Sequence, residues 1–179
     1  MWSFSVLQLA FGVAIPPLVA GLMAMLSNES LAERHHMHHD TYAISPVVSR
    51  SLILVMIFMA VLGCLSGWLS QLGVFATDPE VPLWFFASFE VSLFMAVIAI
   101  FRYRVMAYGD RLLIRPVVGR TRTVFYESIR RMWRTPSTVA EGMHDLMLED
   151  RDGTTLCVSG MLDIEQILLR INRFDVLEG

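Results

Sequence analysis

"SLILVMIFMAVLGCLSGWLSQLGVFAT", residues 51–77, is a run of 27 residues without a charged side chain. A helix that crosses the hydrocarbon core of a bilayer needs about 20 largely apolar residues, so this run is long enough. Residues 1–28 form a second uncharged run, and residues 81–101 form a third, which Glu90 alone interrupts. Three such runs would leave a soluble protein almost no polar surface. The sequence therefore predicts three membrane-spanning helices, at about residues 3–28, 51–76 and 82–101.

The arginines indicate how the predicted helices are oriented. The loop at residues 29–50 holds two arginines, and two more lie within three residues after residue 101, whereas the loop at residues 78–82 holds no basic residue. Basic residues near the ends of spanning helices favour the cytoplasmic side. We therefore expect a multi-pass protein of the plasma (inner) membrane, with its N-terminus outside and its C-terminal region in the cytoplasm.

Small residues recur at helical spacing in two of the predicted spans. Gly63 and Gly67 lie in the second span, and Ser88 and Ser92 lie in the third. Small side chains let the backbones of two membrane helices approach closely, so such residues commonly mark a packing seam. We expect these four residues to form a helix interface, either within this chain or with a partner such as a second copy.

Glu90 is the ionisable residue of the third predicted span. At about 100° per residue it points away from Ser88 and Ser92. The other spans offer no arginine or histidine to pair with it, so loss of solvent favours its neutral form. One interpretation is a hydrogen bond to a backbone carbonyl that Pro16 and Pro17 leave free at an expected kink or break of the first span. The alternatives are contact with a partner membrane subunit, or a proton relay in a small transporter or channel subunit.

The chain changes character after residue 101. The segments "RYRVMAY" (102–108), "RLLIRPVV" (111–118) and "TRTVFY" (121–126) are separated by glycine turns, and "LMLED" (146–150) and "TTLCVSG" (154–160) flank an Asp-Gly turn. Short segments of this kind with Gly-containing turns are typical of antiparallel strands. The last segment, "DIEQILLRINRF" (163–174), has a capping residue and one apolar face, which predict a helix.

This C-terminal part resembles the bacterial pleckstrin-homology-like (PH-like) domains that follow transmembrane helices. The resemblance covers residues 101–174 and rests on "YRVMAYGDRLLIRP" (103–116), "GRTRTVFYESIRRM" (119–132) and the terminal helix. It implies a small bent β-sheet or barrel with a C-terminal capping helix, acting as a lipid- or protein-binding module without enzymatic activity. We thus expect an α+β membrane protein with a three-helix transmembrane region at residues 1–101 and a cytoplasmic PH-like domain at residues 102–179.

Charge is divided within the C-terminal part. Residues 101–134 hold nine arginines and two acids, a net charge of +7, whereas residues 135–179 hold three arginines and nine acids, a net charge of −6. Arginines near a membrane exit are placed to meet anionic lipid headgroups. The predicted headgroup contacts are Arg102, Arg104, Arg120 and Arg122. The alternative is that they pair with the acidic half of the same domain.

Histidines cluster in "ERHHMHHD", residues 33–40, within the first loop. On a helix, His35, His38 and His39 would share one face and could bind zinc, copper or nickel. No cysteine lies nearby to complete such a site. A solvated, pH-responsive loop at the membrane surface is the other interpretation, and the one we favour.

The sequence lacks the residues that several classes of function require. The chain has no lysine, which excludes Schiff-base and P-loop chemistry, and it has no Cys-x-x-Cys or Ser-His-Asp arrangement. The acidic second half of the C-terminal part argues against nucleic-acid binding. We expect a non-catalytic accessory or assembly subunit without a cofactor, which binds the membrane surface, a membrane-protein partner or a second copy. The alternatives are a metal-binding membrane enzyme or sensor using the histidine cluster, and a small transporter or channel subunit using Glu90.

Overall fold

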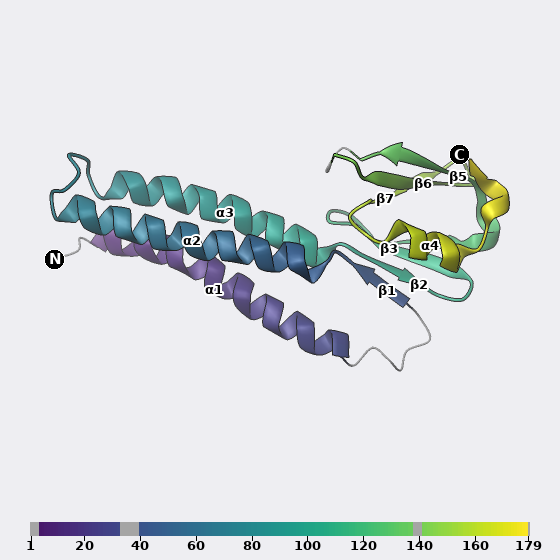
Figure 1. Ribbon diagram of the computed structural model, residues 1–179, viewed down its shortest axis with the longest axis horizontal. Helices are drawn as coiled ribbons and strands as arrows, with labels where there is room; N and C mark the ends of the chain where they lie inside the picture. Colours follow the sequence, from purple (N-terminus) through teal and green to yellow (C-terminus); the bar gives the residue numbers. More distant parts are fainter. Residues whose placement is uncertain (1–3, 33–39, 138–140, 179) are drawn as a thin grey trace. The chain divides into compact units, whose positions relative to one another are not determined.

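The computed structural model describes residues 4–32, 40–137 and 141–178. Within these ranges the chain forms two compact units, which are described separately. The helical unit comprises residues 4–32 and 46–99, and the sheet unit comprises residues 40–45, 100–137 and 141–178. Figure 1 shows the long helices of the first unit and the strands of the second.

The helical unit consists of α1 (Phe4–Ala32), α2 (Pro46–Gln71) and α3 (Glu80–Arg102). The last three residues of α3 belong to the sheet unit. Each of the three is long and apolar enough to cross a membrane. The sequence predicted all three from run length. α1 continues as one helix through Pro16 and Pro17, so the chain is not broken there.

The buried face of α2 carries a row of residues three and four positions apart. These residues are Ser49, Ile53, Met56, Ala60, Gly63, Gly67 and Ser70. Two glycines of this row receive side chains of the neighbouring helices. A Cβ atom added at Gly63 would lie 2.8 Å from Cβ of Phe86 and 3.1 Å from Cγ1 of Val13, and one added at Gly67 would lie 3.0 Å from Cγ of Leu83. The glycines therefore let α1 and α3 approach α2 closely.

α3 turns a different face to this seam from the one that the small residues predict. Its buried residues are Leu83, Ala87, Glu90 and Val97. Ser88 and Ser92 are exposed, and their hydroxyl groups donate hydrogen bonds to backbone carbonyls of α3 itself. Bulky side chains of α3 fill the space that the glycines of α2 leave open, so small residues on both helices are not needed.

The sheet unit contains two four-stranded sheets and a short helix (Figure 1). The first sheet has the order β1-β2-β3-β4 and is antiparallel throughout, with β1 (Asp40–Ala43), β2 (Arg104–Ala107), β3 (Arg111–Arg115) and β4 (Arg122–Phe125). The second has the order β7-β6-β5-β8, with β5 (Ile129–Pro136), β6 (His144–Asp150), β7 (Thr155–Val158) and β8 (Leu177–Glu178). Only β8 runs parallel to its neighbour, β5.

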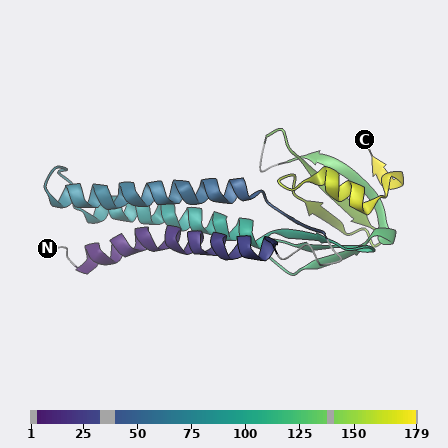
Figure 2. The ribbon, with the colours of Figure 1, turned by 60° about the horizontal axis from the view of Figure 1, so that its bottom comes forward.

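The core of the sheet unit lies between the two sheets and α4 (Ile164–Ile171). Alternate residues of the strands point inward, as the pleat of a strand requires. Val105, Leu112 and Leu148 are among the residues that are fully or almost fully buried there. α4, drawn in yellow in Figure 2, contributes three buried residues of its apolar face to this core. Its start agrees with the prediction, because Asp163 accepts a hydrogen bond from the backbone N–H of Gln166 at 3.1 Å.

Two tyrosines connect separate parts of the sheet unit. The hydroxyl oxygen of buried Tyr103 accepts a hydrogen bond of 2.8 Å from the backbone N–H of Ser159, next to β7. The hydroxyl group of Tyr126 donates to the backbone carbonyl of Tyr108 at 2.8 Å. Burial raises the pKa of Tyr126 to about 12, so its hydroxyl group stays a donor at physiological pH. These hydrogen bonds satisfy polar groups that the core would otherwise leave unpaired.

β1 comes from the loop between α1 and α2, which the sequence assigned to the transmembrane region. It pairs with β2 from Asp40 opposite Ala107 to Ala43 opposite Arg104. Tyr42 packs against the core of the sheet unit, and the carboxylate of Asp40 lies 3.2 Å from the guanidinium of Arg170 on α4. The sheet unit is therefore not a continuous C-terminal segment, because this loop supplies one of its edge strands.

Candidate functional site

One end of the first sheet carries both chain connections to the helices. β2 begins two residues after the end of α3, and β1 ends three residues before the start of α2. Ala43, the last residue of β1, pairs with Arg104, the first residue of β2, and Arg104 pairs with Arg115 at the end of β3. The hairpin that follows β3, residues 116–121, therefore leaves the sheet at this same end. We call it the helix-linked end of the sheet: the row Ala43–Arg104–Arg115 with residues 116–121.

All four arginines predicted to contact headgroups lie at or next to the helix-linked end. Arg102 ends α3, Arg104 begins β2, Arg120 lies in the hairpin and Arg122 begins β4. Arg102, Arg120 and Arg122 are exposed, and Arg104 is half-buried. Arg115 is exposed too, although its position in the sequence does not mark it as a headgroup contact. Only the strand register, which places Arg115 opposite Arg104, reveals that it belongs with the others.

Several ion pairs among the described residues of the sheet unit involve other arginines. They include Arg111 with Asp110, Arg134 with Glu165, Arg170 with Asp40, and Arg173 with Asp175. Among the described residues, no acidic side chain forms an ion pair with Arg102, Arg115, Arg120 or Arg122. Within the described residues, the acidic half of the unit therefore does not pair with these four exposed arginines.

Arg111 differs from these arginines because it is held at the opposite end of the same sheet. Its guanidinium carbon lies 5.7 Å from the ring centroid of Tyr108 and 5.8 Å from that of Phe125. Its Nε atom also lies 3.4 Å from the carboxylate of Asp110 in the β2–β3 turn. The charge of Arg111 is therefore engaged within the sheet unit, by two cation–π contacts and an ion pair.

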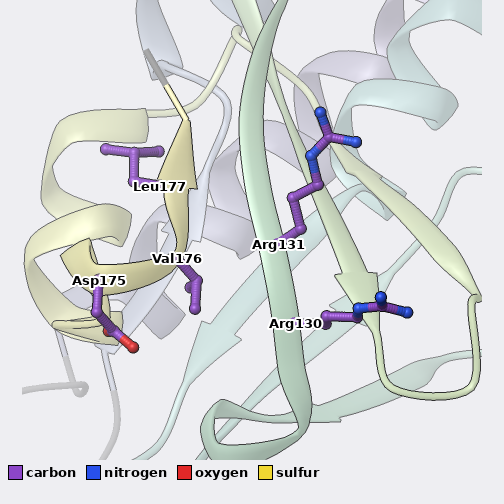
Figure 3. A pocket seen from close by; sticks show the side chains of 5 residues that line it. All are labelled: Arg130, Arg131, Asp175, Val176 and Leu177. Carbon is purple, nitrogen blue, oxygen red and sulfur yellow. The ribbon is translucent and has the colours of Figure 1, made fainter.

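A shallow groove of about 540 Å³ lies beside β5 and is lined by Arg130, Arg131, Asp175, Val176 and Leu177. The register of β5 against β6 shifts between Ile129 and Arg131. In the view of Figure 3, the two arginines extend from one side of β5 and Asp175 lies on the other. The guanidinium of Arg173 donates to this carboxylate at 2.9 Å and lowers the pKa of Asp175. Arg131 stacks on Trp133, with its guanidinium carbon 5.1 Å from the ring centroid.

Glu90 lies inside the helical unit, with none of its surface exposed. Contacts of α2 with α3 join Gly67 to Leu83 and Gly63 to Phe86, so α3 runs antiparallel to α2. Four residues beyond Phe86, Glu90 is thus at the level of Ala60, which offers no side-chain donor. Among the described residues, neither carboxyl oxygen of Glu90 has a hydrogen-bond partner.

The complete burial of Glu90 affects two interpretations of this residue, a hydrogen bond within the chain and a contact with a partner subunit. The predicted hydrogen bond to a carbonyl near Pro16 does not form among the described residues. Contact with another subunit would require the helices to separate, because this chain's own helices cover the carboxyl group completely. The surface of α3 that is open to a partner carries Ser88 and Ser92 instead.

The histidines predicted to bind a metal, His35, His38 and His39, lie outside the described residues. Within the part of the chain that the structure describes, no group of three His, Cys, Asp or Glu side chains is arranged to hold a metal ion.

Comparison with known proteins finds no match to this chain. No protein-family model, no curated protein and no solved structure matches the chain.

Proposed function

We propose that this chain is a non-catalytic integral membrane protein whose sheet unit, a PH-like module, binds the cytoplasmic membrane surface. The three helices cross the bilayer, and the arginines of the helix-linked end bind anionic lipid headgroups. An accessory or assembly role beside a membrane-protein partner or a second copy belongs to the same proposal. The exposed face of α3 with Ser88 and Ser92 is the surface that such a partner would meet.

The proposal is carried by the position of the arginines of the helix-linked end along the chain. An extended residue spans at most about 3.6 Å, so Arg104 lies within about 7 Å of the end of α3. Paired residues of antiparallel strands have Cα atoms about 5 Å apart, which brings Arg115 to the same level. If α3 ends at the lipid–water boundary, these arginines are in the headgroup layer. Each basic residue near an anionic surface contributes about 1 kcal/mol of attraction.

The architecture of the sheet unit supports the PH-like part of the proposal. Two sheets, antiparallel except for β8, enclose a single core, and the amphipathic helix α4 packs against it near the C-terminal end of the chain. Two pockets among its described residues are open grooves on the surface. A module of this form can bind through its surface charge rather than by engulfing a ligand.

We predict that replacing two hairpin arginines weakens the preference of the protein for anionic lipid. The double variant Arg120→Gln/Arg122→Gln should lose about 2 kcal/mol of selectivity for phosphatidylglycerol over phosphatidylcholine. The measurement is the fraction of each spin-labelled lipid that is immobilised by the full chain in reconstituted membranes, at low salt. High salt should reduce the selectivity of the unmodified protein in the same direction.

The matched control replaces two exposed arginines away from the hairpin, Arg130→Gln/Arg151→Gln, and should keep the lipid preference. Equal losses in both double variants would show a diffuse charge effect and would contradict a defined contact surface.

The cytoplasmic orientation of the sheet unit can be tested through Cys157, an exposed free thiol on β7. A membrane-impermeant maleimide should label it only after the cytoplasmic membrane is opened. Partial loss of solvent around the sulfur and the nearby carboxylate of Asp145 raise the pKa of the Cys157 thiol above its ordinary value. Less thiolate is therefore present at neutral pH, so the labelling rate should keep rising with pH beyond the range of an unperturbed cysteine. Labelling of intact cells from outside would place the unit on the opposite side.

A further inference from the structure

The β3–β4 hairpin carries an apolar tip that is not part of the core of the sheet unit. Val117 and Val118 follow Pro116 at its apex, with 37% and 85% of their surface exposed. Gly119 closes the turn with φ of 106°, a conformation that favours glycine. Exposed turns normally carry polar residues, and β-branched residues favour strands. Two consecutive valines at this position are therefore not residues that a turn favours, and they lie outside the core.

Charge surrounds the two valines on both sides. Arg115 precedes the tip, and Arg120 and Arg122 follow it. All three are exposed, and among the described residues none of them has an acidic partner. Large apolar side chains that are exposed elsewhere in the unit, such as Leu169 and Phe174, occur singly. An apolar apex flanked by arginines that have no acidic partner among the described residues is suited to the lipid–water boundary, where acyl chains lie beneath a layer of phosphates.

The register also determines where the tip lies within the sheet unit. Because Arg115 pairs with Arg104, the tip leaves the sheet beside the residues that continue from α3. The β2–β3 turn, with Gly109 and Asp110, is at the other end of the same strands. The valines and the start of β2, which continues from α3, therefore lie at the same end of the first sheet, and the β2–β3 turn lies at the other end.

We propose that Val117 and Val118 insert into the bilayer that α3 crosses, while Arg115, Arg120 and Arg122 bind the phosphates of its anionic lipids. This inference rests on the proposed function and adds to it that the sheet unit is anchored by apolar insertion as well as by charge. The anchor holds the helix-linked end against the membrane and leaves the β2–β3 turn in solvent.

The test measures the depth of the tip with a fluorescent label. In the full chain, with Cys64→Ala and Cys157→Ser, a single Val118→Cys is labelled with a nitrobenzoxadiazole group. The protein is reconstituted in vesicles of phosphatidylcholine and phosphatidylglycerol that contain nitroxide lipids, with the nitroxide on the headgroup or on the upper acyl chain. We expect the acyl-chain nitroxide to quench the label strongly, with a blue shift of its emission.

Matched labels at Gly109→Cys and Asp152→Cys, in two other exposed turns, should show neither effect. A further Val117→Asp in the Val118-labelled protein should remove most of the acyl-chain quenching. Since Val118 is largely exposed, its replacement does not touch the core, and circular dichroism of each variant checks that the fold is retained.

The outcomes separate this inference from the proposed function. Quenching at position 118 by the headgroup nitroxide alone overturns insertion and leaves the headgroup contact standing. Quenching by neither nitroxide overturns both. Acyl-chain quenching that is equal at position 109, or that Val117→Asp leaves unchanged, shows that the label drives its own insertion and overturns the inference.

Discussion

Replacing Gly63 by alanine is expected to lower the free energy of unfolding of the helical unit by about 1–3 kcal/mol. The added Cβ atom would lie 2.8 Å from Cβ and 2.9 Å from Cγ of Phe86, and 3.1 Å from Cγ1 of Val13. The Cβ atom of Phe86 is bonded to the backbone of α3, so it cannot rotate away. Relief of the overlap requires α3 to shift, which separates it from α2 along the seam. Thermal unfolding in mild detergent, followed by the helical signal in circular dichroism, measures the loss.

Gly12→Ala and Gly21→Ala are matched controls for this experiment. Both glycines lie within α1, and an added Cβ atom at either would meet no atom within 4 Å. Because alanine favours helix over glycine, these variants should be as stable as the unmodified protein or slightly more stable. If Gly63→Ala behaves as they do, the close approach at Gly63 does not hold the helices together.

Replacing Glu90 by leucine is expected to raise the free energy of unfolding by about 1–3 kcal/mol. The carboxyl group is completely buried, and among the described residues neither oxygen has a hydrogen-bond partner. A buried polar group without a partner costs free energy, which an apolar side chain of similar size avoids. Leucine also favours helix and can pack beside Ala60. The same detergent unfolding experiment measures the gain.

Ser92→Leu is the control for added apolar surface. Ser92 is exposed on α3, so this variant should change the stability of the helical unit by less than about 0.5 kcal/mol. A loss of stability in Glu90→Leu would mean that the carboxyl group has a favourable contact within the bundle. Loss of a co-purifying membrane protein with the fold intact would support the partner interpretation of Glu90 and require the helices to open in the complex.

The features that agree with the sequence-based expectations are those set by neighbouring residues. An uncharged run of 27 residues forms a helix long enough to span a membrane wherever it lies in the chain. The turns at Gly109-Asp110 and Arg151-Asp152-Gly153 connect paired antiparallel strands, and Asp163 caps α4. In each case the hydrogen bonds or the apolar surface that decide the structure lie within a few residues.

The features that the sequence did not reveal depend on residues that are distant in the chain. A strand as short as β1 is too short to show a hydrophobic periodicity. It forms because the edge of β2, which begins 64 residues after Asp40, is open to it. Asp40 also forms an ion pair with Arg170 on α4. Ser88 and Ser92 have the composition of a packing seam, yet Phe86 and Leu83 fill the space at the glycines of α2. The side-chain volumes on both helices decide which face of α3 packs against α2. The spacing of small residues within one helix does not reveal the volumes on the other.

The sequence by itself determined that this protein has three apolar helices, a following set of antiparallel strands and a capped terminal helix, because each is a local balance of hydrogen bonding and apolar surface. Only the tertiary structure decided that Glu90 is enclosed, that a loop strand completes the first sheet, and that Arg115 and the exposed valines join the other arginines at one end. Those arrangements follow from packing and strand register, which bring together groups that the chain keeps apart.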